Sequence, residues 1–371
     1  MITNDVCTGC GACAVSCPKQ AISMIVSAYG EKIPKINNKQ CVNCNLCKKI
    51  CPQNSNVKTN YPISCYAVFS KNQKDYIFSA SGGAATIFAS YMIDMEGAAY
   101  GCDYNEQGEL IHFKLKTLED IEKAQSSKYS QSSAYEIFEE IKKELRQRNV
   151  LFIGTPCQVA GLKSFVGESK NLLTVDLICH GTPPTKILQD HIRESVCLFP
   201  VNRIRFRGEY DQMLTVWKDN QICYQKSRMD DLYFSSFYRN LISRKSCYYC
   251  KYACSERVAD ITIGDFWGLG ALRTIEKKSN RPSVVLLNTT KGVDFFRNVK
   301  FDLFFEERTV EEAVKGNGRL NNPPGEKIDA KLFRFFYSLN IFGFKKSVYI
   351  TNYFMVVINF LKKYFGGVND T

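Results

Sequence analysis

CTGCGACAVSCP, residues 7–18, and CVNCNLCKKICP, residues 41–52, decide how the N-terminal part of this chain folds. Each stretch spaces its cysteines as C-x2-C-x2-C-x3-C and ends in a proline, and the second stretch begins 34 residues after the first. A third group of cysteines, SCYYCKYAC at residues 246–254, follows much later in the chain. These three groups hold 11 of the 17 cysteines and indicate where the chemistry of the chain lies.

The first two groups have the spacing of a bacterial protein that carries two [4Fe–4S] clusters. In that arrangement, three closely spaced thiolates bind three irons of one cluster, and the fourth cysteine reaches across to the other cluster. We therefore predict one cluster on Cys7, Cys10, Cys13 and Cys51, and a second on Cys41, Cys44, Cys47 and Cys17. A pair of zinc knuckles is the alternative, although zinc sites rarely duplicate eight cysteines with both prolines.

The composition places the chain among globular proteins that keep their cysteines reduced. Its 371 residues allow two or three domains, and 45% apolar and 23% charged residues are ordinary values. The N-terminus lacks the pattern of a secretory signal, so we expect a cytoplasmic protein in which clustered cysteines serve metals or catalysis. The net charge of +12 fits an acidic redox partner, an anionic cofactor or a membrane surface. We expect no nucleic-acid partner, because no basic run or known nucleic-acid module is present.

Beyond a polar linker at residues 54–62, strand patterns alternate with helical ones. We expect strands at 65–70, 97–104, 149–158, 172–181, 259–268 and 283–288, and helices at 81–95 and 134–148, the latter with Ile137, Ile141 and Leu145 on one face. Such alternation predicts an α/β body.

Four cysteines of the body come from three places next to these segments. Cys157 and Cys179 come at the ends of two buried strands, where ligands bind in α/β sheets. Cys247 and Cys250 have the C-x2-C spacing that lets two thiolates share a metal site. These four cysteines are consistent with a third [4Fe–4S] cluster. The alternative is that Cys157 and Cys179 belong to the core and that residues 246–254 form a small zinc site.

Several motifs in this order behind the two-cluster region resemble the family of coenzyme F420 hydrogenase/dehydrogenase beta subunits. They are SGGAAT, SSKYSQS, GTPCQVAGL, DLICHGTPP, SCYYCKYAC and DITIGDFWG, and the resemblance covers about residues 1–325. It implies FAD in the α/β body beside an iron–sulfur cluster, and an oxidoreductase that exchanges electrons with a small redox molecule, either coenzyme F420 or another. It also implies that Cys157, Cys179, Cys247 and Cys250 ligate the body cluster, whereas Cys254 does not match a family-wide position.

The resemblance also suggests residues that bind the flavin or the substrate. Glycines before a helix let backbone amides approach a phosphate. Charged and aromatic side chains near a cluster suit contacts to flavin or substrate. His180 is a candidate to tune the cluster or donate a proton, and a structural hydrogen bond is the alternative. The predicted cofactor-binding residues are Ser81, Gly82, Gly83, Lys128, Tyr129, Thr155, Pro156 and Asp265, and the predicted catalytic residues are Lys128 and His180. Taken alone, SGG would be an ordinary turn, KYS a solvated surface and Asp265 a buried turn residue.

The remaining cysteines and histidines have no partner by spacing. His112 and His191 are expected at the surface or in the core. Cys65, Cys102, Cys197 and Cys223 are expected to be small buried apolar residues.

The C-terminal residues 331–365 are dense in aromatics and punctuated by lysines. The apolar run from Tyr353 to Ile358 is far shorter than the roughly 20 residues that a membrane span requires. We expect an amphipathic helix that docks on the body. The alternative is a helix that lies at a membrane surface, helped by Lys345, Lys346, Lys362 and Lys363.

Together these patterns predict three regions. Residues 1–58 form an α+β ferredoxin-like domain with two [4Fe–4S] clusters, residues 63–325 form an α/β flavin-binding body divided near residue 145, and residues 326–371 form an aromatic-rich helical tail. The predicted function is an iron–sulfur flavoprotein oxidoreductase that also meets a redox partner protein, in the cytoplasm or at the inner face of the membrane. The rival function is a non-catalytic electron carrier that serves a partner enzyme.

Overall fold

The computed structural model describes residues 6–196, 199–209, 212–270 and 281–365. Its strands form a two-stranded, a three-stranded and an eight-stranded sheet. The strands are β1 (Ile22–Val26), β2 (Lys32–Ile36), β3 (Ser64–Ser70), β4 (Ala98–Tyr104), β5 (Leu110–Leu115), β6 (Val150–Gly154), β7 (Leu172–Leu177), β8 (Arg203–Arg205), β9 (Met213–Lys218), β10 (Gln221–Ser227), β11 (Ile261–Asp265), β12 (Ser283–Leu287) and β13 (Leu303–Arg308).

Helices connect and cover these strands. The α-helices are α1 (Ala12–Val15), α2 (Leu46–Lys49), α3 (Gln73–Phe78), α4 (Ala84–Asp94), α5 (Leu118–Ala124), α6 (Phe138–Glu144), α7 (Pro156–Val166), α8 (Thr185–Ser195), α9 (Leu232–Tyr238), α10 (Thr290–Val299), α11 (Val310–Gly316), α12 (Ile328–Ser338) and α13 (Phe344–Phe365). Short 3₁₀ helices are η1 (Tyr135–Ile137), η2 (Lys245–Tyr249), η3 (Lys300–Asp302) and η4 (Gly318–Leu320).

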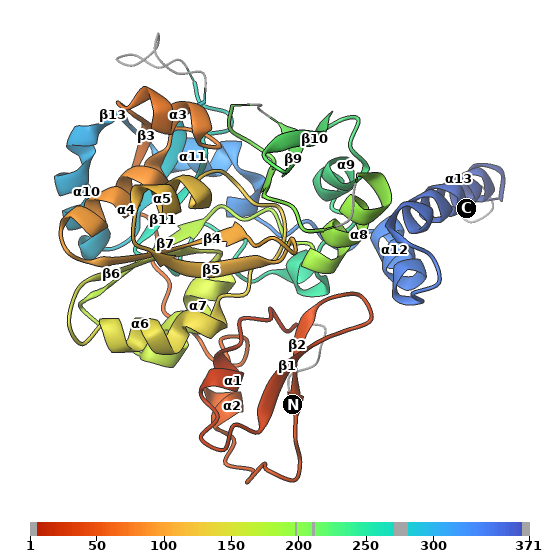
Figure 1. The fold of residues 1–371 in the computed structure, drawn as a ribbon, viewed down its shortest axis with the longest axis horizontal. Coiled ribbons are helices and arrows are strands. Elements are labelled where there is room, and N and C mark those ends of the chain that lie inside the picture. The colour runs from red at the N-terminus through yellow and green to blue at the C-terminus, as the bar shows by residue number, and fades with distance from the viewer. Residues whose placement is uncertain (1–5, 197–198, 210–211, 271–280, 366–371) are drawn as a thin grey trace, which may run out of the picture.

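The N-terminal lobe is small and projects from one end of the molecule (Figure 1). It consists of the antiparallel pair β1–β2 with the one-turn helices α1 and α2. The turn between β1 and β2 reaches the first helix of the tail, because the Tyr29 ring packs edge-on against Phe333 and Tyr337 of α12. Glu31 in the same turn forms a 3.0 Å ion pair with Arg334. The lobe is therefore anchored to α12 by a buried aromatic and charged contact.

The eight-stranded sheet is mixed, with the order β13-β3-β12-β11-β7-β6-β4-β5. Its centre, β11-β7-β6-β4, is parallel, and every pair outside this centre is antiparallel. The central strands are almost wholly buried, as expected of parallel strands covered on both faces. Helices α4, α5 and α10 lie on one face, and α6 and α7 lie on the other (Figure 1). The α/β body expected from the sequence is confirmed, with each expected strand in place but several of them shorter.

The expected helix over 134–148 is divided between η1 and α6 and ends at Glu144. Its apolar face is as expected, because Ile137, Ile141 and Leu145 are all buried. The linker at 54–62 is not free of the body, since Asn60 forms a backbone bridge with Arg257.

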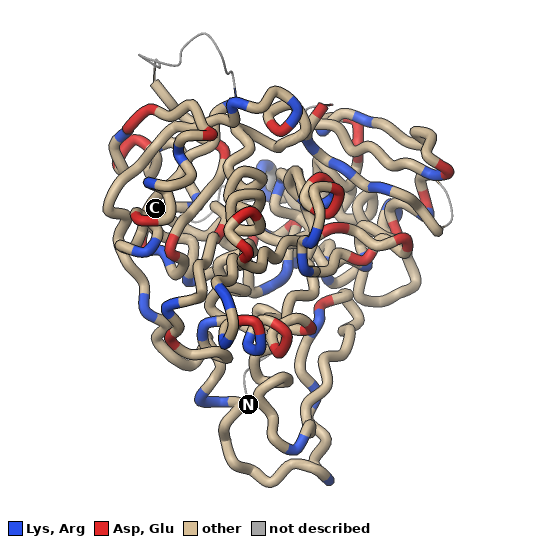
Figure 2. The backbone as a smooth tube through the Cα atoms, turned by 60° about the vertical axis from the view of Figure 1, so that its left-hand side comes forward, with Lys and Arg blue, Asp and Glu red and all other residues tan. Residues whose placement is uncertain are grey.

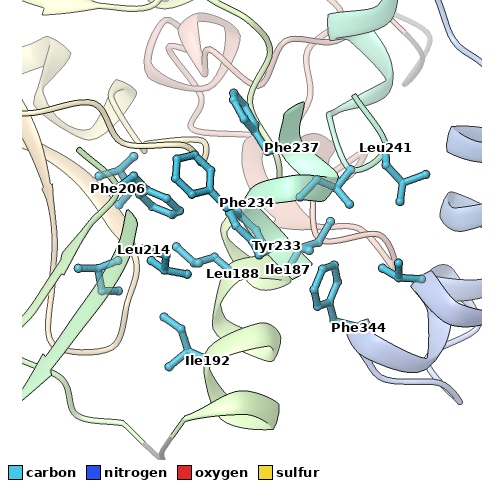
Figure 3. Close-up of a cluster of buried hydrophobic side chains, with 14 of the residues drawn as sticks. Ile187, Leu188, Ile192, Phe206, Leu214, Tyr233, Phe234, Phe237, Leu241 and Phe344 are labelled. Carbon is cyan, nitrogen blue, oxygen red and sulfur yellow. The ribbon is translucent and has the colours of Figure 1, made fainter. Parts of the chain in front are cut away.

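The three-stranded sheet β10-β9-β8 was not expected from the sequence. Together with α8 and α9 it encloses a second hydrophobic core, which includes Ile187, Phe206, Leu214 and Tyr233 (Figure 3). Phe344, the first residue of α13, enters the same cluster and thereby fixes the start of the tail.

The tail is helical, as expected, but only its beginning docks on the body. Phe344, Val348 and Thr351 of α13 are buried, whereas none of the described residues after Thr351 is. The rest of α13 projects away from the body (Figure 1). Within the described ranges, the structure has no helix with both the length and the apolar character needed to traverse a bilayer.

Candidate functional site

The cysteines of the N-terminal lobe converge in two separate sets. Cys7, Cys10, Cys13 and Cys51 line one small cavity, beside Pro52. A second small cavity is lined by Cys17, Cys41, Cys44 and Cys47, beside Pro18. These sets reproduce the crossed arrangement expected from the spacing, in which the last cysteine of each stretch joins the other set. The donor set, four thiols around each of two small cavities, fits the cysteine ligation of [4Fe–4S] clusters.

We call the cavity at Cys7, Cys10, Cys13 and Cys51 the proximal site, because it lies against the body. A Cβ atom added to Gly161 of α7 would lie 2.8 Å from Cys10 Cβ and 3.0 Å from Cys10 Sγ. A Cβ added to Gly11 would lie 2.3 Å from the Tyr135 ring. Gly11 also has a φ of 72°, which favours glycine. Glycines on both sides therefore permit the lobe to approach α7 closely.

The four cysteines Cys17, Cys41, Cys44 and Cys47 form the distal site, at the other end of the lobe. Cys44 is exposed there, and Val42 and Leu46 beside it are exposed as well. The distal site is therefore the more accessible of the two from solvent.

Four cysteines of the body also lie together, which we call the body site. Cys157 is the second residue of α7, Cys179 follows β7, Cys247 lies in η2, and Cys250 ends η2. Burial is the main cause that raises the pKa of Cys250 to about 12, and the neighbouring sulfurs of Cys157 and Cys247 act in the same direction. The pKa of Cys179 is also raised, mainly by burial and further by the nearby sulfurs of Cys247, Cys157 and Cys250. The elements that carry these cysteines are thus brought to one place by the fold.

Cys254 lies outside the body site. Its thiol donates to the carbonyl oxygens of Lys251 and Glu256, at 3.5 and 3.2 Å. Burial raises its pKa, and the charges that act on it belong to Arg257, Glu256 and Asp176 rather than to another cysteine. In the described residues, no group of three or more His, Cys, Asp or Glu side chains is close enough to hold a single metal ion.

The other cysteines differ from one another. Cys65 is buried, as expected, and Cys102 is partly buried. Cys223 is exposed, so the expectation of a buried residue was wrong: its strand β10 is the outer strand of the small sheet and is largely exposed. Cys197 lies outside the described residues.

A cavity of about 240 Å³ adjoins the body site at the carboxyl ends of the parallel strands. Thr155 after β6, Cys179 and His180 after β7, and Asp265 at the end of β11 all contribute to its wall. The volume is near the lower end of small-molecule pockets, roughly 300–1,000 Å³. The cavity therefore has room for a ring system or a small substrate beside a cysteine of the body site.

The predicted glycine loop forms one wall of this cavity, at the start of α4. Gly83 is the N-cap residue with a φ of 84°, and no side chain caps the helix. Gly82 donates its amide to the Ser283 hydroxyl at 2.8 Å, and the hydroxyls of Ser81 and Ser283 share a 2.7 Å hydrogen bond. A Cβ on Gly82 would lie 2.0 Å from the Val68 carbonyl oxygen. The uncapped amides at the start of α4 thus face the cavity, an arrangement that suits an anion.

Lys128 lies in the cavity wall, but its ammonium group is already bonded. Its Nζ donates to the carbonyl oxygens of Lys123, Ala124 and Gln125, at the end of α5, at 2.6 to 3.1 Å. Asp103 lies 3.9 Å away. Burial lowers the pKa of Lys128 to about 8, and Asp103 acts in the opposite direction. These contacts give Lys128 a role as a C-cap of α5, and a contact to flavin or substrate stays a prediction.

Tyr129 also lines the cavity, within an aromatic group. Its ring centroid lies 4.6 Å from that of Phe237 and 5.1 Å from that of Phe206. Burial raises its pKa, and Arg207 acts against this rise.

Arg207, which the sequence did not suggest, contacts two residues of the cavity wall, Asp265 and Ala80. Its guanidinium donates to the Asp265 carboxylate at 2.9 Å and to the Ala80 carbonyl oxygen at 2.8 Å. It therefore joins the end of β11 to the loop before α4. Nothing in the sequence indicated this ion pair, because Arg207 follows β8, a strand that was not expected.

Thr155 and Pro156 begin α7. Thr155 caps the helix in a reciprocal arrangement with Gln158, and Pro156 occupies the first helical position. The Thr155 hydroxyl lies 3.2 Å from the Cys157 sulfur and also lines the cavity. The loop before α7 thus connects the body site to the cavity.

The histidines occupy three different surroundings. His180 is exposed at the cavity. The protein atoms around its ring displace water and lower its pKa, and the positive charge of Arg319 lowers it further. His112 is a buried core residue that also lines the cavity, and burial lowers its pKa to about 4. His191 is buried in the second core, where its Nε2 lies 2.7 Å from Asp231.

Comparison with known proteins identifies two regions. Residues 147–313 match the family described as the C terminus of the coenzyme F420 hydrogenase/dehydrogenase beta subunit, and residues 6–55 match the 4Fe-4S dicluster domain. The resemblance stated from the motifs is therefore confirmed, and the dicluster match supports iron–sulfur clusters in the lobe.

Two curated relatives are similar to parts of the chain. The F subunit of the F(420)H(2) dehydrogenase of Methanosarcina mazei is 26% identical over 194 residues, which cover 48% of this chain and 54% of the relative. The coenzyme F420-dependent sulfite reductase of Methanocaldococcus jannaschii is 26% identical over 173 residues, 44% of this chain and 26% of the relative. The matches thus span about half or less of the length of these relatives.

A solved structure of the F420-reducing [NiFe] hydrogenase complex from Methanosarcina barkeri aligns with 84% of this chain and 95% of its own chain. The sequence identity is 16% and the TM-score is 0.47.

Proposed function

From the match of residues 147–313 to the family of coenzyme F420 hydrogenase/dehydrogenase beta subunits, we propose that the chain is an iron–sulfur flavoprotein oxidoreductase. It exchanges electrons between [4Fe–4S] clusters, FAD and a small redox substrate, either coenzyme F420 or another molecule. The observation that carries this proposal is the position of Cys179, which belongs to the body site and also lines the cavity.

The route for electrons follows the order of the three cysteine sites. The distal site is accessible from solvent, and the proximal site contacts α7 through Cys10 and Gly161. Cys157 lies one turn before Gly161 on the same helix, at the body site. Electrons therefore pass between the distal, proximal and body sites, and the cavity lies at the end of this series.

The residues around the cavity hold the cofactor and substrate in this proposal. Ser81, Gly82 and Gly83 place the uncapped start of α4 against a phosphate group. Thr155 and Tyr129 line the position of the ring system, Pro156 fixes the start of α7 beside Thr155, and Asp265 is oriented by Arg207. When bound, FAD supplies the exchange between single electrons and electron pairs that clusters alone lack.

His180 is the proposed proton donor of the cavity, because it is exposed there and follows Cys179 directly. Its lowered pKa favours the neutral ring at neutral pH, so donation to the substrate requires that the ring first takes up a proton from solvent. Lys128 retains a second proposed role, which is to place positive charge behind the cavity wall while it caps α5.

The test is the cofactor content of the anaerobically purified chain. Three clusters give about 12 iron atoms per chain, because each holds four. We expect about 12 iron, one FAD and no zinc, and about 8 iron in Cys157→Ser. About 8 iron with one zinc and no flavin in the unaltered chain would instead support the rival, a non-catalytic electron carrier.

The redox partner protein is proposed to dock at the distal site. The first 58 residues carry seven lysines and two acidic residues, and the acidic Glu31 is paired with Arg334. Figure 2 shows basic but no acidic segments at the far end of the lobe. The exposed lysines of the lobe are Lys19, Lys35, Lys39, Lys48 and Lys49. Such a basic rim around an exposed site attracts an acidic partner.

This docking is tested with an acidic ferredoxin as electron donor. We expect Lys48→Glu/Lys49→Glu to slow electron transfer at low ionic strength, and added salt to reduce the difference from the unaltered chain. Lys142→Glu/Lys143→Glu, which alters an adjacent lysine pair on α6, is the control. Equal rates for both pairs would contradict docking at the distal site.

The projecting end of α13 is proposed to contact an anionic membrane surface at the cytoplasmic face. Tyr353, Val356 and Phe360 are 69%, 68% and 56% exposed, and Lys362 and Lys363 follow directly. A projecting apolar segment beside lysines suits a membrane interface with anionic lipids. We expect the chain to sediment with phosphatidylcholine vesicles that contain phosphatidylglycerol, and Val356→Asp to reduce this binding. No binding to vesicles of either composition would contradict the proposal.

A further inference from the structure

Arg244 lies where the N-terminal lobe meets the body site. It directly precedes η2, and its carbonyl oxygen accepts a 3.0 Å hydrogen bond from the Cys247 amide. Its side chain is 2% exposed, which makes it one of the largest fully enclosed side chains of the molecule. The residue thus belongs to the segment that carries the body cysteines.

The guanidinium group points in the other direction, to the loop that carries the proximal cysteines. Its Nη2 donates to the carbonyl oxygens of Cys7, at 2.9 Å, and Lys32, at 3.3 Å. Its Nη1 donates to Gln131, whose own amide donates to the Thr8 carbonyl oxygen at 2.9 Å. A single buried side chain therefore lies between the proximal and body sites.

The positive charge of Arg244 has no carboxylate partner among the described residues. Two of the other enclosed arginines differ in this respect: Arg257 pairs with Asp176 at 3.0 Å, and Arg207 pairs with Asp265 at 2.9 Å. The buried Nε of Arg244 also has no hydrogen-bond partner. An enclosed charge is costly unless an opposite charge compensates it.

We propose that Arg244 is the shared counter-charge of the proximal and body clusters, and that it raises the reduction potential of both. The inference rests on the proposed function, because it requires clusters at both sites. A [4Fe–4S] cluster with its thiolate ligands is an anion, and it becomes more negative when it accepts an electron. A fixed cation beside it stabilises the reduced form more than the oxidised form. Reduction then adds one electron without the need for a proton.

A merely structural role is the alternative, since the same hydrogen bonds clamp the lobe to the body. The two roles differ in their response to charge. A clamp depends on hydrogen-bond donors at the right positions. At residue 244, the glutamine amide would provide some of these donors, and the lysine ammonium group would provide donors in a different geometry. A counter-charge depends on the cation, which lysine keeps and glutamine lacks.

The experiment compares Arg244→Gln and Arg244→Lys in the anaerobically purified full chain. The midpoint potentials of the clusters are measured by redox titration followed by electron paramagnetic resonance, with iron content as a second readout. We expect lower potentials for two clusters in Arg244→Gln and recovery in Arg244→Lys. Unchanged potentials in Arg244→Gln with full iron content would overturn the proposal.

A matched control is Arg205→Gln. Arg205 is also enclosed and donates to the carbonyl oxygens of Phe78 and Glu122, away from the cluster cysteines. Its removal should leave the potentials unchanged. If Arg244→Gln loses iron, retention of iron by Arg244→Lys supports the charge role, and equal loss in both variants overturns it. An unaltered chain with about 8 iron atoms contradicts the proposed body cluster. The reduction potential of the proximal cluster, compared between the unaltered chain and Arg244→Gln, then tests the role of Arg244 separately.

Discussion

Arg257 provides the most quantitative test of how the body site is held together. It is 1% exposed, and its Nη2 lies 3.0 Å from the Asp176 carboxylate. The same side chain donates to Thr262 and to the carbonyl oxygens of Tyr252 and Cys254. It thereby connects the segment after Cys250 to β7 and β11. Replacement by methionine keeps much of the volume but removes the charge and all of these donors.

The expected cost follows from what remains behind. Asp176 has no exposed surface, and one of its carboxylate oxygens already lacks a hydrogen-bond partner. In Arg257→Met, its remaining side-chain donor is the Thr262 hydroxyl, at 2.6 Å. Loss of one partner of a buried pair typically costs about 3–5 kcal/mol of the free energy of unfolding. We expect a loss of this size for Arg257→Met.

The assay is urea unfolding followed by pulse proteolysis, with the double variant Arg257→Met/Asp176→Leu in a double-mutant cycle. The double variant should recover part of the loss, because no charge is left buried without a partner. Arg297→Met is the control, since its ion pair with Asp294 is exposed and should contribute less than about 1 kcal/mol. A cost below about 1 kcal/mol for Arg257→Met would refute the reasoning.

Three further predictions concern the cavity and the cysteines. His112 has a pKa of about 4 in the folded chain and 6.5 as its ordinary value, so below pH 6.5 the unfolded chain binds a proton that the folded chain does not. Stability should fall between pH 6.5 and 4, by about 3 kcal/mol in total, and His112→Phe should show a correspondingly smaller fall in urea titrations at each pH. Gly82→Ala should lose bound flavin and unfold at lower temperature, because its Cβ would overlap the Val68 carbonyl oxygen at 2.0 Å; full flavin content would count against the glycine loop as the cofactor site. Cys254→Ser should keep the iron content of the unaltered chain, whereas Cys250→Ser should lose about four iron atoms, and equal loss in both would show that the body site has a different ligand set.

The cysteine sets were the most predictable part of the molecule. The crossed grouping of Cys17 and Cys51 follows from the spacing of the two repeats, and the structure gathers both sets accordingly. Cys157 and Cys179 were located through the buried strands that precede them. The grouping of these side chains was predictable because short-range spacing and strand burial are local properties of a sequence, and their role as cluster ligands stays a prediction.

The missed features depend on long-range packing. The sheet β8–β10 includes a three-residue strand and a register shift between Ile222 and Tyr224, so its alternation is weak in the sequence. The pairing of Arg207 with Asp265 joins residues 58 positions apart. The bonds from the Lys128 ammonium group to the carbonyl oxygens at the end of α5 were not foreseen either, and its contact to flavin or substrate stays a prediction. A sequence pattern indicates which residues carry charge, but the fold decides which partner neutralises it.

The tail shows the same limit. Its apolar residues predicted a helix that docks on the body, and Phe344 and Val348 do so. The pattern continues through residues 353–361, where no described part of the body covers the helix. Periodicity alone could not distinguish the docked half from the projecting half.

The most direct test of the central claim is whether electrons reach a flavin through the cysteine sites of this chain. The anaerobic protein would be mixed with a one-electron donor, and the absorbance of the bound flavin would be followed in the unaltered chain and in Cys157→Ser. We predict complete flavin reduction in the unaltered chain and a much slower reaction in Cys157→Ser, whose flavin content should be similar. Absence of flavin from the unaltered chain, or the same rate in both proteins, would contradict the account.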